Sequence, residues 1–279
     1  MFREILDRKF TFESFGVRVT IESNKDELLE KASEVAESAL LGKLKIIENR
    51  GVDLGHRFGV GLDDSGTFYL FQNGEQTNYT DLEFHFFKNL NSMIRLIVAE
   101  NAENRVFVHA GVVGWKGKAV VLPGSSHRGK TTLVTELIRN GADYYSDEYA
   151  IFDHLGLVHP FPRDLTVRGA GTEFYETSVR PQSLGAKIGE VPINVGAVLL
   201  TEFRKNSKWK PQIIRTGEGI LQTIPHTIPL HADTKFSLKV LNIAFKRAII
   251  AKSFRGDAKT EVVKILSFLD KHLDQMTSI

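Results

Sequence analysis

The 279-residue sequence contains no cysteine. Disulfide bonds and cysteine-based metal sites are therefore excluded. The absence of disulfide bonds fits a protein kept in a reducing compartment. It also lacks any apolar stretch close to the ~20 residues that span a bilayer. Charged residues interrupt the apolar ones at its N-terminus, so the apolar core of a signal peptide is missing as well. We expect a cytoplasmic protein with no membrane partner.

A large net charge is absent too, because the formal charge is only +2. Residues 201–279 nevertheless hold 14 Lys and Arg against 7 Asp and Glu, whereas residues 1–200 hold 22 against 27. The basic C-terminal part could face an acidic or phosphorylated partner, or it could be an ordinary solvated surface. Since no aromatic residues interleave with a basic stripe, we do not expect nucleic acid as a partner.

The composition that remains, 42% hydrophobic and 25% charged, is typical of a globular protein. We predict a small N-terminal α+β domain at 1–103 and an α/β domain that carries the chemistry at 104–279. Within the first domain the pattern indicates a strand at 16–21, a hairpin at 58–71 and a long helix at about 81–101.

The most informative stretch runs from Gly124 to Thr131, where GSSHRGKT matches the phosphate-loop pattern G-x-x-x-x-G-K-[ST]. Apolar strands are predicted before it at 106–113 and 118–122, joined as a hairpin by the tight turn 114–117, and a helix is predicted after it at 132–140. Glycines let successive backbone N–H groups converge on phosphate oxygens at the helix N-terminus. A turn that serves packing alone would not need a lysine at this positive end of a helix. We predict nucleotide contacts from Gly124, Ser125, Ser126, His127, Arg128, Gly129, Lys130, Thr131 and Thr132.

Two residues of this loop have predicted roles of their own. Lys130 is expected to reach the β- and γ-phosphates of a bound nucleotide. The hydroxyl of Thr131 is expected to bind Mg²⁺, which takes oxygen ligands and keeps several waters. The predicted cofactors are therefore ATP and Mg²⁺.

Two adjacent acids, Asp147 and Glu148, interrupt the apolar and aromatic stretch 144–152, which we predict to be a strand. Neighbouring strand residues point to opposite faces, so both can reach one Mg²⁺ only if the strand ends or bulges there. An acid after the phosphate-loop helix commonly completes the Mg²⁺ shell or takes the nucleophile's proton. The alternative is a surface pair on an edge strand.

A loop with prolines and glycines follows at 160–171, and it carries two arginines. Arg163 and Arg168 could each bind a phosphate or pair with a local carboxylate such as Asp164. Asp153 is expected to stabilise the turn that contains Gly156.

The remaining stretches indicate ordinary secondary structure. We predict strands at 195–200 and 236–241 and a closing helix at 260–273 with Val263, Leu266 and Leu269 in its core.

In this order of features the sequence resembles HPr kinase/phosphorylase and its relatives, whose fold is similar to that of phosphoenolpyruvate carboxykinases. The likeness rests on His109 in the strand before the hairpin, the phosphate loop, the Asp147-Glu148 pair, and the run 165–171. That run, LTVRGAG, resembles the family signature L-E-I-R-G-L-G. The likeness covers residues 104 to 279. It departs from the family at Thr166, which stands where the signature has a magnesium-binding glutamate, and at the bulky pair 127–128.

The resemblance implies an HPr kinase / phosphoenolpyruvate carboxykinase type P-loop kinase domain, with the α+β unit preceding it. It implies that Asp147 is the general base, that Lys130 holds the triphosphate, and that His109 lies near the reacting phosphate. Thr131 and Glu148 would then serve the magnesium ion. Arg168 is a further predicted phosphate contact.

The leading hypothesis is an ATP-dependent kinase that transfers the γ-phosphoryl group to a hydroxyl, most simply a serine, of a peptide, protein or small molecule. One alternative is a nucleotide-binding regulator that senses ATP or ADP without transfer. Another is a carboxykinase-like enzyme acting on a small carboxylic acid. The sequence leaves open the acceptor and whether identical chains associate.

Overall fold

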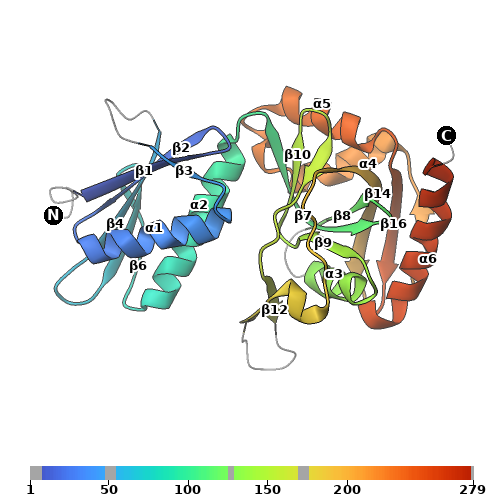
Figure 1. Ribbon diagram of the computed structural model, residues 1–279, viewed down its shortest axis with the longest axis horizontal. Helices are drawn as coiled ribbons and strands as arrows, with labels where there is room; N and C mark the ends of the chain where they lie inside the picture. Colours follow the sequence, from blue (N-terminus) through green and yellow to red (C-terminus); the bar gives the residue numbers. More distant parts are fainter. Residues whose placement is uncertain (1–7, 48–54, 125–128, 169–175, 278–279) are drawn as a thin grey trace. The chain divides into compact units, whose positions relative to one another are not determined.

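A computed structural model describes residues 8–47, 55–124, 129–168 and 176–277. The chain divides into two compact units, Met1–Asn104 and Arg105–Ile279. Each unit combines helices with its own sheet, so the protein is a mixed α/β protein (Figure 1). Within the described ranges, no helix has both the length and the apolar content needed to cross a membrane.

The N-terminal unit is a six-stranded sheet with two helices packed on it. The strand order is β3-β1-β2-β4-β5-β6. All neighbours are antiparallel except β2 and β4, which are parallel. One hydrophobic core joins sheet and helices, through residues such as Phe12, Phe58, Ala32 and Leu90. The elements are β1 (Arg8–Ser14), β2 (Val17–Ser23), α1 (Asp26–Leu40), β3 (Lys45–Ile46), β4 (His56–Leu62), β5 (Phe68–Gln72), β6 (Glu75–Thr80) and α2 (Glu83–Asn101).

The C-terminal unit is built around a sheet of eight strands, seven of which lie in the order β11-β10-β7-β8-β14-β16-β15, with β9 also paired to β7. The strands β8, β14 and β16 are parallel to one another, and the remaining pairs are antiparallel. Its strands are β7 (Arg105–Trp115), β8 (Lys118–Pro123), β9 (Asp143–Ser146), β10 (Tyr149–Asp153), β11 (Leu157–His159), β14 (Ile193–Phe203), β15 (Gln212–Ile213) and β16 (Ile249–Arg255). A separate two-stranded ribbon consists of β12 (Leu165–Arg168) and β13 (Glu176–Val179).

Helices cover this sheet on both faces, as in other three-layer α/β folds. On one face α3 and α6 contribute apolar residues such as Leu137 and Ile265 to a core that includes Val120. A second core contains Val240 and Phe245 of α5 together with strand residues. The helices are α3 (Lys130–Arg139), α4 (Thr216–Thr223), α5 (Thr234–Phe245) and α6 (Ala258–Thr277), with 3₁₀ turns η2 (Pro181–Leu184), η3 (Ile224–His226) and η4 (Ile228–Leu230).

Most predicted elements of this unit are confirmed, including the hairpin of β7 and β8. Its turn uses Lys116 and Gly117, both at positive φ (50° and 71°), which matches the twist of the flanking strands. The Asp153 prediction is also confirmed, since its Oδ1 accepts from the N–H groups of Leu155 and Leu157 at 2.9 and 3.0 Å.

Two predictions for the C-terminal part are wrong. The stretch 236–241 lies in helix α5, whose N-cap Asp233 accepts from the Phe236 N–H at 2.8 Å and whose buried positions follow helical spacing. In α6, Val263 is 66% exposed, because the neighbouring residues Val262 and Ile265 turn into the core instead.

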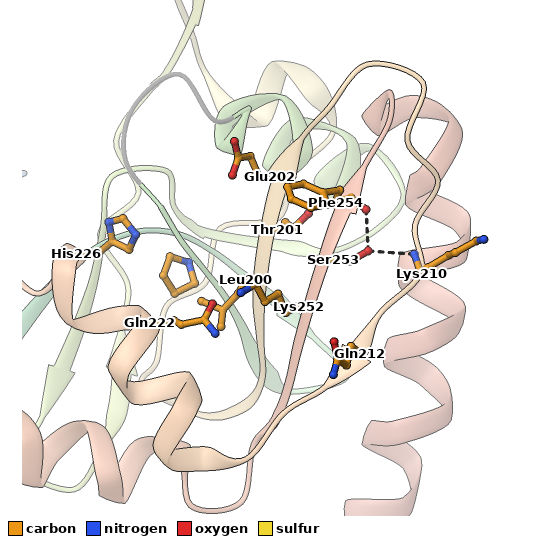
Figure 2. A pocket seen from close by; sticks show the side chains of 11 residues that line it. Leu200, Thr201, Glu202, Lys210, Gln212, Gln222, His226, Lys252, Ser253 and Phe254 are labelled. Atoms are coloured by element: carbon orange, nitrogen blue, oxygen red, sulfur yellow. Dashed lines mark hydrogen bonds between the residues drawn. The ribbon is translucent and has the colours of Figure 1, made fainter.

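A cavity of about 490 Å³ opens at the carboxyl ends of the three parallel strands (Figure 2). Pro123 of β8, residues 200–202 of β14 and residues 252–254 of β16 contribute to its wall. The fold thus places a cavity directly beside the point where β8 enters the predicted phosphate loop.

Candidate active site

The predicted phosphate loop connects the buried central strand β8 to the N-terminus of α3. Gly124 follows β8 directly, and its N–H donates to the His109 carbonyl of β7 at 3.2 Å. Gly129 is the N-cap of α3 with φ 78°, a left-handed conformation that favours glycine. Ser125, Ser126, His127 and Arg128 lie outside the described residues. The N-terminus of α3 therefore lies at the carboxyl end of β8. The partial positive charge of a helix N-terminus favours the binding of an anion there.

Lys130 is the first residue of α3, and its side chain points back toward Gly124, the first residue of the loop. Its Nζ donates to the Gly124 carbonyl at 2.6 Å. The ammonium group is therefore held at the mouth of the loop, near where phosphate oxygens would bind. Thr132, by contrast, is exposed in the same first turn.

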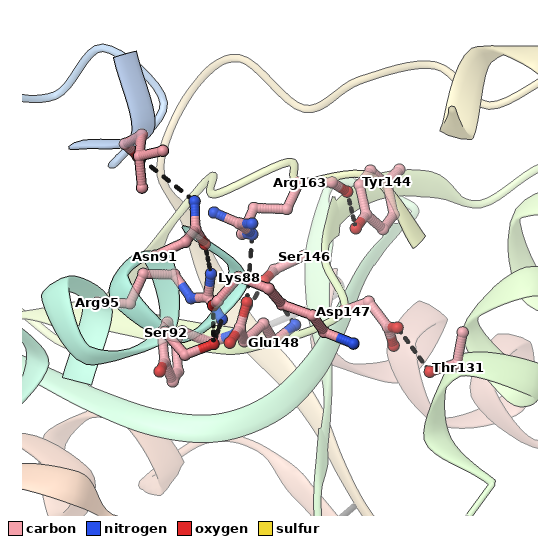
Figure 3. A network of polar contacts seen from close by, with 12 residues as sticks. Lys88, Asn91, Ser92, Arg95, Thr131, Tyr144, Ser146, Asp147, Glu148 and Arg163 are labelled. Atoms are coloured by element: carbon pink, nitrogen blue, oxygen red, sulfur yellow. Dashed lines mark hydrogen bonds and ion pairs between the residues drawn. The ribbon is translucent and has the colours of Figure 1, made fainter. Parts of the chain in front are cut away.

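Asp147 contacts the first turn of α3 directly. Its Oδ2 accepts a hydrogen bond from the Thr131 hydroxyl at 2.7 Å (Figure 3). Burial raises the pKa of Asp147 to about 6, against the opposing effects of the Thr131 hydrogen bond and the Lys130 charge. Its other oxygen, Oδ1, is buried and has no hydrogen-bond partner among the described residues. A buried acceptor without a donor is uncommon in proteins, and it fits a cation or a proton donor that binds there.

Glu148 points away from Thr131, toward Arg163 (Figure 3). Its Oε2 lies 3.3 Å from the Arg163 Nε. A hydrogen bond fixes the backbone of Arg163, because its carbonyl accepts from the Tyr144 hydroxyl at 2.6 Å. The two adjacent acids therefore have different neighbours.

A break in the predicted strand explains this divergence. The stretch 144–152 forms two strands, β9 and β10, and not one continuous strand. The Ser146 hydroxyl accepts from the N–H groups of Glu148 and Tyr149 at 3.1 and 3.0 Å, which closes the bend between them. Both strands pair with β7 and neither acid is exposed, so the acids lie at an irregularity of the sheet and do not form a surface pair.

His109 lies on β7 opposite Tyr149, half-buried. Burial, together with the neighbouring charges of Lys130 and His226, lowers the pKa of His109 to about 4. The imidazole is therefore neutral at neutral pH.

This shift predicts a pH dependence of stability. Because the folded pKa of about 4 is below the usual 6.5, the unfolded chain takes up the proton first as pH falls. His109 therefore costs stability progressively from about pH 6.5 down to about pH 4, by at most roughly 3 kcal/mol, and less where solvent reaches the ring. Urea unfolding of the wild type and His109→Asn at several pH values should show this difference growing on acidification. The exposed His231→Asn variant is the control, and parallel curves for wild type and His109→Asn would contradict the prediction.

The remaining predicted site residues lie on the β12–β13 ribbon or next to it. Thr166 is exposed on β12, and Arg168 is the last residue of that strand. The Arg168 side chain lies outside the described part of the structure. The Asp164 Oδ2 accepts from the Ser178 hydroxyl at 3.1 Å, whereas the local carboxylate beside Arg163 is that of Glu148.

Comparison with known proteins adds little to this geometry. No protein-family model matches the chain, and neither does any curated protein. Among the solved structures, the chain is similar to the HPr(Ser) kinase/phosphatase from Coxiella burnetii, with 14% identity, a TM-score of 0.31, and coverage of 61% of this chain and 98% of that one. A likeness of this extent supports no conclusion about the activity of this chain.

Arg255, at the end of β16, contacts the same loop and was not predicted. The residue is only 2% exposed, and its Nη2 donates to the Gly129 carbonyl at 2.5 Å. The same carbonyl also accepts the first helical hydrogen bond of α3, from the Leu133 N–H. Its Nη1 donates to the Gly256 carbonyl at 3.0 Å, while its Nε is buried without a hydrogen-bond partner among the described residues. Burial lowers the pKa of Arg255. No local sequence signal could find this contact, because 126 positions separate the two residues.

Arg255 therefore acts on the loop as a positioning residue. Replacing it with alanine removes a charge-assisted hydrogen bond to Gly129, so if the loop binds ATP as its sequence predicts, the Kd for ATP should rise about tenfold or more. Because no reacting atom is touched, kcat should change less than KM, and Arg255→Lys should recover part of the affinity. Calorimetry and steady-state kinetics measure both effects. The exposed Arg247→Ala variant is the control, and unchanged ATP affinity in a folded Arg255→Ala protein would contradict this role.

Proposed function

We propose that the chain is an ATP-dependent phosphotransferase that moves the γ-phosphoryl group to a hydroxyl of a peptide, protein or small molecule. The observation that carries this proposal is the contact of the half-buried Asp147 with Thr131, at the first turn of the helix that follows the phosphate-loop sequence. A phosphate-binding end and a proton acceptor are the two parts that such a transfer needs.

Asp147 is the proposed general base. A hydroxyl acceptor is a weak nucleophile near pH 7, so a carboxylate that accepts its proton during transfer lowers the barrier. A pKa of about 6 keeps Asp147 mostly ionised at neutral pH and makes it a better acceptor than an ordinary aspartate. Its fixed hydrogen bond to Thr131 orients the carboxylate before the acceptor binds.

The residues at this position also fit Mg²⁺. The Thr131 hydroxyl is an oxygen ligand of the kind this ion prefers, and the Asp147 Oδ1, which lacks a donor among the described residues, stays available for the acceptor hydroxyl. A bound Mg²⁺ would neutralise charge on the phosphates. The predicted role of Glu148 toward the metal stays a proposal, and it requires that side chain to leave Arg163.

The proposed roles of the remaining site residues follow from their positions and charges. Lys130, at the mouth of the loop, is proposed to bind the β- and γ-phosphates. His109 is neutral at neutral pH, so it is proposed to orient the reacting phosphate by a hydrogen bond and not by charge. Arg168 remains a proposed phosphate contact. An HPr-kinase-like fold for residues 104–279 and a serine acceptor belong to the same proposal.

A transfer assay tests this function. The protein is incubated with γ-labelled ATP, Mg²⁺, and a panel of serine peptides, free serine, other small alcohols and small carboxylic acids. Label on a hydroxyl supports the proposal. Label on a carboxylate would favour the carboxykinase-like alternative. Tight ATP binding with neither transfer nor hydrolysis would favour a nucleotide-sensing regulator.

A further inference from the structure

The cavity at the carboxyl ends of β8, β14 and β16 begins where β8 enters the phosphate-loop sequence. Its wall begins at Pro123, the residue immediately before Gly124. Ligands of open parallel sheets bind in the crevice outside the carboxyl ends of the strands. The cavity volume of about 490 Å³ is within the usual range for a small-molecule site.

Asp147 lies on the opposite side of β8. It follows β9, which pairs with β7, whereas the cavity is formed on β14 and β16, and β8 separates the two regions in the sheet. If the γ-phosphate faces Asp147, the rest of a nucleoside triphosphate must extend from the loop in another direction. The cavity on the β14 side is continuous with Pro123 and offers that space.

The cavity lining carries polar groups of the kinds that bind a nucleoside. The Gln222 Nε2 donates to Glu218 at 3.0 Å, which fixes the amide and leaves its oxygen to accept from the amino group of a base. Glu202 supplies a carboxylate, which is the usual partner of ribose hydroxyls. Lys252, paired with Leu200, adds a cation to the same lining, two positions farther from the carboxyl ends of the strands than Glu202 and Phe254.

One aromatic ring is also part of the wall. Phe254 is 40% exposed, and the Arg204 guanidinium lies over its ring at 3.5 Å from the centroid. Figure 2 shows Glu202, Thr201 and Phe254 grouped at one end of the cavity and Gln222 and His226 extending from α4 and η3. Polar and apolar groups thus surround one space, as a flat heterocycle joined to a sugar requires.

We propose that this cavity binds the nucleoside moiety of the nucleotide donor, with Gln222 at the base and Glu202 at the ribose. The inference rests on the proposed function, because it takes the position of the phosphates from the loop and the direction of the γ-phosphate from Asp147. It assigns the donor, and not the hydroxyl acceptor, to the β14–β16 side of the sheet.

Calorimetry with two ligands tests this assignment. ATP carries a nucleoside, whereas inorganic tripolyphosphate presents only the phosphates. Wild-type protein should bind ATP more tightly than tripolyphosphate. Gln222→Ala should weaken ATP binding about five- to twentyfold by removing the proposed hydrogen bond to the base, and tripolyphosphate binding should stay within about twofold. Glu202→Gln, a second mild change, should act in the same direction.

Two further variants serve as references. Gln182→Ala replaces an exposed glutamine of η2, outside the cavity lining, and should change neither affinity. Lys130→Ala should weaken both ligands alike, because it acts on the phosphates.

Each remaining outcome overturns the inference in a distinguishable way. Equal wild-type affinity for ATP and tripolyphosphate removes the nucleoside assignment and leaves the proposed function standing. Unchanged ATP affinity in both cavity variants, with a raised KM for the acceptor, assigns the cavity to the acceptor. Wild-type protein that binds neither ligand contradicts the proposed function as well.

Discussion

Replacing Asp147 with asparagine should lower kcat for phosphoryl transfer by about 10²–10⁴-fold, the usual contribution of a general base. Asparagine keeps the size of the side chain, and its amide oxygen can still accept from Thr131, which donates to the carboxylate at 2.7 Å. The loop should therefore stay in place, and the Kd for ATP measured without metal should change little. Steady-state kinetics with the best acceptor, together with calorimetry, measure the two quantities.

Two matched variants make this result specific. Asp143→Asn changes an aspartate of the preceding strand β9, and it should leave kcat near the wild-type value. Glu148→Gln weakens the contact with Arg163 and should reduce activity less than Asp147→Asn. If Asp147→Asn is folded and fully active while Glu148→Gln is inactive, the two acids have been assigned the wrong roles.

Replacing Lys130 with alanine should reduce kcat/KM for transfer by at least about 100-fold, because a cation that binds phosphates at the transition state is lost. The free energy of unfolding should change little, because Lys130 is only partly buried and its hydrogen bond to the Gly124 carbonyl joins two residues of the same loop. Unlike Asp147→Asn, this change should weaken nucleotide binding itself.

Ligand-dependent thermal unfolding measures that loss. At an ATP concentration 100 times the Kd, the wild type should gain about 2.7 kcal/mol of stability. The Lys130→Ala variant should gain much less at the same concentration, while Lys239→Ala, an exposed lysine of α5, should behave as wild type. Equal stabilisation of Lys130→Ala and wild type would show that the nucleotide does not use the loop.

The parts of the fold that local patterns determine could be predicted. The β7–β8 hairpin and the strand and helix around the loop depend on residues close in sequence, whose periodicity is visible. Stretch 236–241 was misread because its short alternation imitates a strand, whereas the cap at Asp233 and the buried Phe245 belong to a longer helical pattern. Periodicity over six residues does not distinguish the two.

The candidate site could be predicted only in part, for a similar physical reason. The phosphate-loop pattern pointed to Lys130 and Thr131, and the adjacent acids were visible as charges in an apolar stretch. Their divergence depends on the bend closed by Ser146, which the strand interpretation missed. Arg255 depends on a contact between chain segments far apart in sequence, so the folded sheet is needed to find it.

The most direct test of the central claim is a ³¹P NMR time course with ATP, Mg²⁺ and the best hydroxyl acceptor. Phosphotransfer predicts that the γ-phosphate signal of ATP is replaced by a phosphoester signal that grows in equal amount with ADP. This conversion should stop when the metal is chelated and should be nearly absent in Asp147→Asn. Release of inorganic phosphate alone, or no consumption of ATP with any acceptor, would contradict the claim.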